Sequence, residues 1–266
     1  MTHNLQPPIW RAPPEPLELA AGEIHVWRAS LLVDAEEIAR LKPLLSPDEA
    51  ARAERFRFEK DNSALIARRA ILRLILGRYL EQEAVRQPFE INAYGKPRIP
   101  KGMPGEDLRF NSSHSSGIAL FAVALARELG VDIESVRPNI DYIGIAERFF
   151  SEQEQATLLA LPEDAQQEAF FACWSRKEAY VKARGMGLSI PLNQFDVAFA
   201  PGEPARLIAT RDNPEEAARW SMYDLQPGEG FAGALVAEGQ AANVKCWQWL
   251  PAETAPAKNT NSASAD

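Results

Sequence analysis

Two acidic residues separated by a single position, Asp132 and Glu134, stand in the segment GVDIE at 130–134. Side chains two positions apart on a β-strand point to the same face, so a strand here would hold both carboxylates side by side. Neighbouring carboxylates repel each other unless a cation lies between them, and Mg²⁺ is a hard ion that prefers carboxylate oxygens. The alternative is a strand whose acidic face is simply solvated, which is common in sheets with one wet face.

A second cluster, WSRKEAYVK at 174–182, has helical spacing. Glu178 follows Trp174 by one helical turn and Lys182 follows Glu178 by another, so the acid and the amine continue a stripe that begins with an aromatic side chain. One interpretation is an ordinary Glu–Lys pair on a helix surface. The other is that Glu178 adds a third carboxylate to a metal site and that Lys182 neutralises a phosphate.

A third group of polar residues lies in the segment 94–116. The sequence Gly-Lys-Pro at 95–97 predicts a tight turn that would present Lys96 to an anion. The run NSSHSS at 111–116, with Ser113 and His114 at its centre, offers hydroxyl and imidazole donors that suit phosphate oxygens. The alternative is a polar hairpin loop that satisfies its own backbone.

The charge of the chain is unevenly distributed. The formal net charge is −8 over 266 residues, which disfavours a general nucleic-acid binder. Between Asp48 and Arg73, however, seven basic residues face five acidic ones, so this part is locally positive. The seven are Arg52, Arg55, Arg57, Lys60, Arg68, Arg69 and Arg73.

Several classes of protein are excluded by what the sequence lacks. The longest strongly apolar stretch, 118–126, is about half of the ~20 residues that a membrane-spanning helix needs. The first residues lack a basic region followed by an apolar one, so we expect no secretory signal. The two cysteines, Cys173 and Cys246, match no metal-ligand spacing. The chain carries no phosphate-binding loop, no dinucleotide-binding glycine motif and no hydrolase nucleophile elbow. We expect a cytoplasmic protein that binds neither membranes nor nucleic acid.

The order of elements predicts an α+β fold with two related halves, each with helices followed by antiparallel strands. Ser46 and Ser151 have the form of helix caps, and Gly185 that of a helix stop. Strands are expected at 23–28, 89–92, 108–112, 118–126, 131–134, 195–199, 206–210, 220–225, 231–236 and 244–250, and helices from 46, over 63–80 and over 142–184.

Four domain segments follow from this order. Residues 1–21 are rich in proline and are expected to form an extended arm. Residues 22–128 form an N-terminal lobe and residues 129–250 a C-terminal lobe. The tail, 251–266, is rich in alanine, asparagine, serine and proline and is expected to be disordered.

Taken in order, the motifs resemble the surfactin-synthetase-activating (Sfp) type of 4′-phosphopantetheinyl transferase. The matching segments are YGKP at 94–97, FNSSHS at 110–115, GVDIE at 130–134 and WSRKEAYVKARGMGL at 174–188. The likeness covers about 46–195 well. It implies two pseudo-twofold-related lobes, each with helices packed on a small antiparallel sheet. It also implies transfer of phosphopantetheine from coenzyme A to a serine of an acyl or peptidyl carrier protein, which releases adenosine 3′,5′-bisphosphate.

The resemblance assigns roles to individual residues. Asp132, Glu134 and Glu178 would bind Mg²⁺, Glu134 directly or through water, and Glu178 would accept the serine proton. Lys182 would contact the pyrophosphate, so Asp132, Glu178 and Lys182 form the catalytic set. The residues that would hold coenzyme A are Arg52, Lys60, Lys96, Ser113, His114 and Lys182. One departure is Glu49, which stands where some relatives have a basic residue.

The resemblance also implies partners. The substrate would be an apo carrier protein, usually an acidic helical bundle, which we expect to dock between the two halves near residues 185–188. Because one chain contains both halves, we expect a monomer. The carrier could serve fatty-acid, polyketide, nonribosomal-peptide or lysine synthesis. The rival hypotheses are a metal-dependent phosphohydrolase and a non-catalytic module that binds a carrier protein or a nucleotide.

Overall fold

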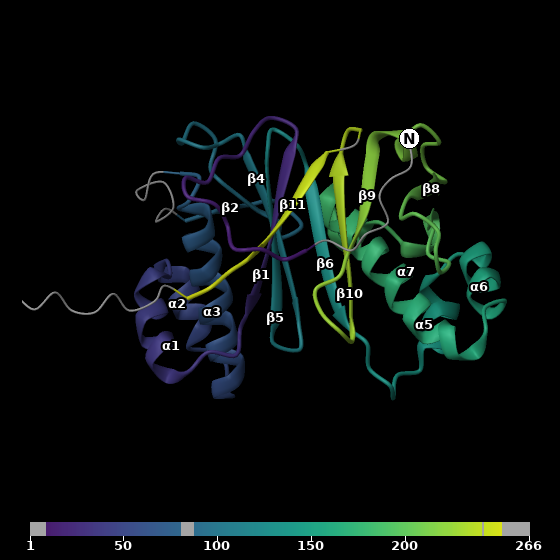
Figure 1. Cartoon of the computed structure of the whole chain (residues 1–266), viewed down its shortest axis with the longest axis horizontal. Helices are drawn as coiled ribbons and strands as arrows, with labels where there is room; N and C mark the ends of the chain where they lie inside the picture. Colours follow the sequence, from purple (N-terminus) through teal and green to yellow (C-terminus); the bar gives the residue numbers. More distant parts are fainter. Residues whose placement is uncertain (1–8, 81–87, 241, 252–266) are drawn as a thin grey trace, which may run out of the picture.

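The computed structural model describes residues 9–80, 88–240 and 242–251, and these form two β-sheets that face each other and are covered by helices on their outer sides (Figure 1). The first sheet has the order β11 (Asn243–Gln248), β1 (Glu23–Ser30), β5 (Ile118–Leu125), β4 (Leu108–Ser115). The second has the order β6 (Leu129–Ser135), β10 (Phe231–Glu238), β9 (Trp220–Leu225). Two-stranded pairs join β2 (Glu90–Ile91) to β3 (Pro97–Arg98) and β7 (Phe195–Val197) to β8 (Leu207–Thr210).

The helices form the two outer layers. On one side are α1 (Ala35–Leu41), α2 (Pro47–Ala53) and α3 (Glu59–Leu76); on the other are α5 (Tyr142–Phe149), α6 (Glu152–Leu159) and α7 (Glu163–Arg184) (Figure 1). Short 3₁₀ turns lie at Lys42–Leu44, Gly187–Ser189, Leu192–Gln194 and Glu216–Arg219. The expected α+β class, with helices packed on small sheets, is confirmed.

Strand alternation divides the apolar side chains among three cores. On β6, Leu129, Val131 and Ile133 point between the two sheets, where they meet side chains of the first sheet such as Leu120 and Ala122. The even-numbered positions of β6 therefore face the helices of the second layer. Strand β5 alternates in the same way between the central core and the core under α3.

The predicted helix ends are largely confirmed. Ser46 and Ser151 cap α2 and α6 with reciprocal capping boxes, and Gly185 ends α7 with a φ of +64°. Helix α3, however, runs over Glu59–Leu76 rather than over 63–80. Its first turn lacks the apolar periodicity used for the prediction, but the acidic Glu59 and Asp61 stabilise the positive end of the helix dipole there.

One strand pairing differs from the prediction. The sheets were expected to be antiparallel, but β11 pairs parallel to β1, with Glu23 opposite Asn243. A strand from the 129–250 segment therefore extends the sheet of the 22–128 segment. The division into these two lobes stays a prediction. Within the arm, Arg11 bridges to Trp247; residues 1–8 and 252–266 lie outside the described residues.

Both cysteines are free and buried. Among the described helices, none combines the length and the apolar character needed to cross a membrane.

The buried His25 predicts a pH dependence of stability. Burial, with a contribution from Lys245, lowers the pKa of His25 from 6.5 to about 4, although Glu23 opposes the shift. The unfolded chain therefore binds a proton at a pH where the folded chain does not. The contribution of His25 to the free energy of unfolding is complete above pH 6.5 and is lost as the pH drops toward 4. We expect His25 alone to contribute a loss of about 2 kcal/mol between pH 7 and pH 5 in urea denaturation.

The matched variant is His25→Gln, which keeps a polar group opposite the Tyr79 hydroxyl, 2.9 Å from His25 Nδ1 in the native chain. Its loss of stability over the same pH interval should be smaller by about that amount. An equal loss in both proteins would contradict this assignment.

Candidate active site

Helix α7 lies directly on strand β6 at Gly130. A β-carbon at this position would stand 2.2 Å from the carbonyl oxygen of Ala179 and 2.3 Å from the amide nitrogen of Ala183. Both atoms belong to the helix backbone, so neither can rotate away. The glycine of the GVDIE motif is therefore what lets the helix approach the strand. The next residue on the same face of the strand is Asp132.

Asp132 is buried and binds two groups through one oxygen. Its Oδ1 accepts hydrogen bonds from Ser113 Oγ at 2.8 Å and from Lys182 Nζ at 2.5 Å. Its Oδ2 is also buried, yet none of the described residues donates a hydrogen bond to it. Burial raises the pKa of Asp132, while Lys182 and Ser113 oppose that rise. The interpretation of this strand as a solvated acidic face is therefore wrong for Asp132.

Glu134 and Glu178 lie close enough to Asp132 for its charge to affect both. Burial raises the pKa of each glutamate, and the negative charge of Asp132 raises it further. Within the described ranges, no group of three or more His, Cys, Asp or Glu side chains is drawn together tightly enough to hold a metal ion. Repulsion between neighbouring carboxylates agrees with the contribution of Asp132 to the raised pKa values and with the absence of a tight group of acids among the described residues.

Lys182 takes part in this cluster rather than in a plain surface pair with Glu178. Its ammonium donates to Ser113 Oγ at 2.8 Å as well as to Asp132. The positive charge of Arg137 also reaches Glu134. Two cations therefore lie near three carboxylates, so the cluster as it stands keeps a surplus of negative charge.

The motif NSSHS belongs to strand β4 and is not a loop. Asn111 Oδ1 accepts the amide hydrogen bond of Val131 at 2.9 Å, and Ser115 Oγ accepts that of Ser135 at 3.0 Å. In the described part of the chain, β6 pairs with β10 on one edge and with no strand on the other. The side chains of Asn111 and Ser115 therefore accept hydrogen bonds from backbone amides on this free edge. Ser113, between them in the alternation, reaches Asp132.

Alternation on β4 separates the two residues that were predicted to hold phosphate together. Ser113 is buried against Asp132, whereas His114 is exposed and lies beside Arg68 of α3. Partial desolvation and the positive charges of Arg68 and Lys182 lower the pKa of His114 to about 4, so its ring is neutral at pH 7.

A basic cluster on α2 and α3 adjoins His114. Arg52, Arg68 and Arg69 lie close enough together for Arg52 to lower the pKa of both other arginines, although burial is the larger cause. Arg68 has its pKa lowered to about 10, and its buried Nε has no hydrogen-bond partner among the described residues. Sequence reasoning counted Arg68 and Arg69 among the basic residues but gave them no role. The sequence signal that could have identified them is that these two arginines interrupt the apolar stripe of α3.

Glu49 is the carboxylate shared by this cluster. Its Oε2 accepts hydrogen bonds from Arg73 Nε at 2.9 Å and from the Ser46 amide at 3.1 Å, and its Oε1 lies 3.8 Å from Arg69 Nε. The departure at position 49 therefore has a structural reason, because the glutamate completes the capping box of α2. Asp48 adds a second negative charge near Arg69 and Arg73. Two carboxylates do not balance the four arginines at 52, 68, 69 and 73, so the cluster attracts an anion.

Lys96 lies outside both clusters. Its ammonium donates to Glu128 Oε2 at 2.8 Å, to the carbonyl of Leu129 at 3.0 Å and to the carbonyl of Ala183 at 3.2 Å. Asn92 ties the same turn to the end of α7 through the carbonyl of Gly185. The YGKP turn is thus docked on α7, with the three donors of its lysine in use.

The remaining predicted residues lie near the basic cluster. Arg52 is exposed and lines a cavity of about 590 Å³ together with Asp48, Ala51, Arg55 and Phe56. Lys60 is exposed on the first turn of α3.

Comparisons with known proteins decide the family. A model of the "4′-phosphopantetheinyl transferase superfamily" matches residues 128–236. The chain is 37% identical over 240 residues to the 4′-phosphopantetheinyl transferase HetI of Nostoc sp., covering 90% of this chain and 98% of that protein. This chain belongs to the 4′-phosphopantetheinyl transferase superfamily.

The chain is also similar to other proteins. The 4′-phosphopantetheinyl transferase Sfp of Bacillus subtilis is 35% identical over 162 residues, which cover 61% of this chain and 70% of that protein. The holo-[acyl-carrier-protein] synthase of Thermotoga maritima, a solved structure, matches 43% of this chain and 64% of its own with a TM-score of 0.33 and 23% identity.

The expected activity is thereby confirmed. As a member of this superfamily, the chain transfers the 4′-phosphopantetheinyl group of coenzyme A to carrier proteins. The phosphohydrolase and the non-catalytic module are set aside.

The close contact at Gly130 predicts that adding one methyl group at this position lowers both stability and the transfer rate. Gly130→Ala would force α7 away from β6, because the new β-carbon meets backbone atoms at 2.2 and 2.3 Å. We expect a loss of stability of about 1–3 kcal/mol and a fall in transfer rate of more than 10-fold. Thermal unfolding and the transfer rate measured on the same samples test both.

Gly202→Ala is the control, because nothing lies within 4 Å of its added β-carbon and its φ of +79° costs only left-handed strain. It should lower stability by about 1 kcal/mol and keep its activity. Wild-type transfer by Gly130→Ala would refute the role of the contact.

Proposed function

We propose that the transfer takes place at Asp132, Glu134, Glu178 and Lys182, and that the three acids bind Mg²⁺. One observation carries the proposal: the Oδ2 of Asp132 is buried with no hydrogen-bond partner among the described residues, and a buried carboxylate oxygen is costly unless a cation or a donor satisfies it. The raised pKa values of Glu134 and Glu178 support it, since burial and then the charge of Asp132 destabilise each carboxylate. All the donors are oxygens, as Mg²⁺ prefers.

When bound, Mg²⁺ supplies neutralisation of the charge that develops on the leaving bisphosphate. The chain's own residues do the rest. Lys182, partly exposed on its side chain and held between Asp132 and Ser113, offers its remaining donor to the pyrophosphate. Glu178, whose pKa is raised by burial, accepts the proton of the carrier serine, either directly or through a water molecule. No covalent intermediate with the protein is needed.

We place the 3′-phosphate of coenzyme A at Arg52, Lys60 and His114, extended by Arg68 and Arg69. The unbalanced positive charge around Glu49 and the unpartnered Nε of Arg68 support this choice. The roles of Ser113 and Lys96 toward the phosphates stay predictions, because their polar atoms are already engaged within the protein.

The carrier protein, in our proposal, docks between the two halves near the end of α7, at residues 185–188. Ser113 of the first sheet, Asp132 of the second sheet and Lys182 of α7 meet within one chain, which supports a monomer as the active unit.

Removal of either central acid tests the proposed metal site. Asp132→Ala and Glu178→Gln should each lower transfer at least 100-fold while the circular dichroism spectrum stays native, because both remove a metal-binding oxygen. The measurement is the mass of an apo carrier protein after incubation with coenzyme A and Mg²⁺, in which transfer adds one phosphopantetheine. Glu168→Gln, an exposed acid on the same helix, is the control. Wild-type turnover in either site variant would refute the metal assignment.

A change at Arg68 tests the phosphate site. Arg68→Met should raise the KM for coenzyme A about 10-fold, the size expected for the loss of one charge-assisted hydrogen bond. The KM for 3′-dephospho-coenzyme A should not change, because that substrate lacks the phosphate in question. Arg57→Met, at an exposed arginine of the same region, should affect neither. An equal rise for both substrates in Arg68→Met would contradict this placement.

A further inference from the structure

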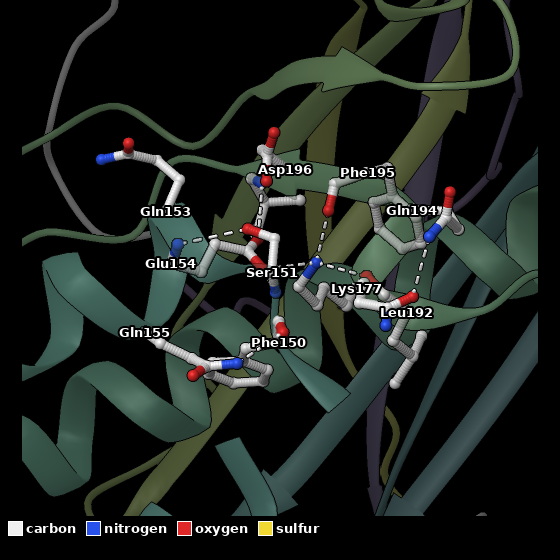
Figure 2. A network of polar contacts seen from close by, with 12 residues as sticks. Phe150, Ser151, Gln153, Glu154, Gln155, Lys177, Leu192, Gln194, Phe195 and Asp196 are labelled. Carbon is white, nitrogen blue, oxygen red and sulfur yellow. Dashed lines mark hydrogen bonds and ion pairs between the residues drawn. The ribbon is translucent and has the colours of Figure 1, made fainter. Parts of the chain in front are cut away.

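Helix α7 carries a fully enclosed lysine immediately before Glu178. Lys177 is 0% exposed, and its ammonium makes three contacts: with Glu154 Oε2 at 2.7 Å, the carbonyl of Leu192 at 2.7 Å and the carbonyl of Phe195 at 2.6 Å (Figure 2). An ammonium has three N–H donors, so each one has an acceptor. The ring of Phe195 also lies 4.2 Å from the nitrogen.

Glu154 is equally well satisfied. It is 2% exposed, and its Oε2 also accepts the amide hydrogen bond of Ser151 at 3.0 Å, while its Oε1 accepts that of Val197 at 2.9 Å. Glu154 belongs to the capping box of α6, and Val197 belongs to β7. The buried pair therefore joins the start of α6, the middle of α7 and strand β7 at one point (Figure 2).

The pair lies on the side of α7 that faces away from β6. Two residues along a helix correspond to about 200° of rotation, so Lys177 points away from the side of Ala179, whose backbone touches Gly130. The helix is thus held from opposite sides, by the strand at Gly130 and by the Lys177 ammonium. Two opposed contacts fix both the distance of α7 from β6 and the rotation of the helix about its axis.

A buried ion pair contributes little net stability compared with apolar side chains of similar size, so its presence calls for another explanation. We propose that Lys177, held by Glu154, is a positioning residue: it sets the rotation of α7 that turns Glu178 toward Asp132. This inference rests on the proposed role of Glu178. It assigns Lys177 no contact with substrate or metal.

The test replaces the pair with uncharged side chains of similar shape, Lys177→Met/Glu154→Gln, so that no buried charge is left alone. We expect kcat to fall at least 10-fold, with the KM for coenzyme A changed less than twofold. Mg²⁺ affinity, measured by calorimetry in the presence of coenzyme A without a carrier protein, should fall about 10-fold.

The neighbouring residue provides a matched control. Arg176 is also buried on α7 and binds a carboxylate, Asp224 Oδ2 at 2.7 Å, as well as the carbonyl of Ala198, but it ties the helix to β9. Because Asp224 is half exposed, Arg176→Met/Asp224→Asn should lower the melting temperature less than the Lys177 double variant does, and it should keep kcat and Mg²⁺ affinity. Wild-type kcat in the Lys177 double variant, or an equal fall of kcat in the control, would overturn the inference.

If the Lys177 double variant does not fold, Glu154→Gln alone replaces it. This change keeps both carbonyl acceptors of Lys177, so kcat should fall less, with KM unchanged; an unchanged kcat overturns the inference.

The Glu178→Gln background separates this inference from the proposed function. If Lys177 acts through Glu178, adding the pair replacement to Glu178→Gln lowers Mg²⁺ affinity no further, and a further fall overturns the inference. If Glu178→Gln alone keeps wild-type transfer and Mg²⁺ affinity, the proposed function fails instead.

Discussion

The site depends on one steric constraint, the direct contact of the α7 backbone with strand β6 at Gly130. A side chain there would push the helix outward by the width of a methyl group. Asp132 would then lose Lys182, which now lies 2.5 Å away across that contact. The glycine and the aspartate occupy the same face of the strand, so one local sequence, GVDIE, provides both the space and the charge. In our account the buried pair of Lys177 and Glu154 holds the helix from its opposite side.

The charges around strand β4 are arranged on two faces. Ser113 faces the acids, and His114 faces the arginines of α2 and α3. An acidic group with Lys182 and Arg137 nearby lies on one side, and a cluster of arginines that shares Glu49 lies on the other. Coenzyme A carries a pyrophosphate and a separate 3′-phosphate. In our proposal the pyrophosphate needs the metal on the acidic face, and the 3′-phosphate needs the basic face. The alternation of one strand then separates the two phosphate sites.

Sequence reasoning reached the family, the fold class and the candidate acids because these depend on local patterns. The spacing of Asp132 and Glu134, the helical step from Glu178 to Lys182 and the capping boxes are all readable over a few residues. The parallel pairing of β11 with β1 was missed because it joins residues about 220 positions apart, which no local periodicity encodes. The contacts of Lys96 were missed for a similar reason, since its acceptors at Leu129 and Ala183 become neighbours only in the folded chain. The segment with Asn111 and Ser115 reads as a group of hydrogen-bond donors in the sequence. Their role as acceptors for the backbone amides of β6 depends on the free edge of that strand, which only the folded chain shows.

The location of a bound metal tests the central claim most directly. Crystals of the full chain grown with Mn²⁺ in place of Mg²⁺ and with coenzyme A would reveal the ion by its anomalous scattering. The account predicts one strong peak within bonding distance of Asp132 Oδ2, with oxygens of Glu178 and of the pyrophosphate around it. A peak elsewhere, or none beside Asp132 while coenzyme A is bound, would contradict it.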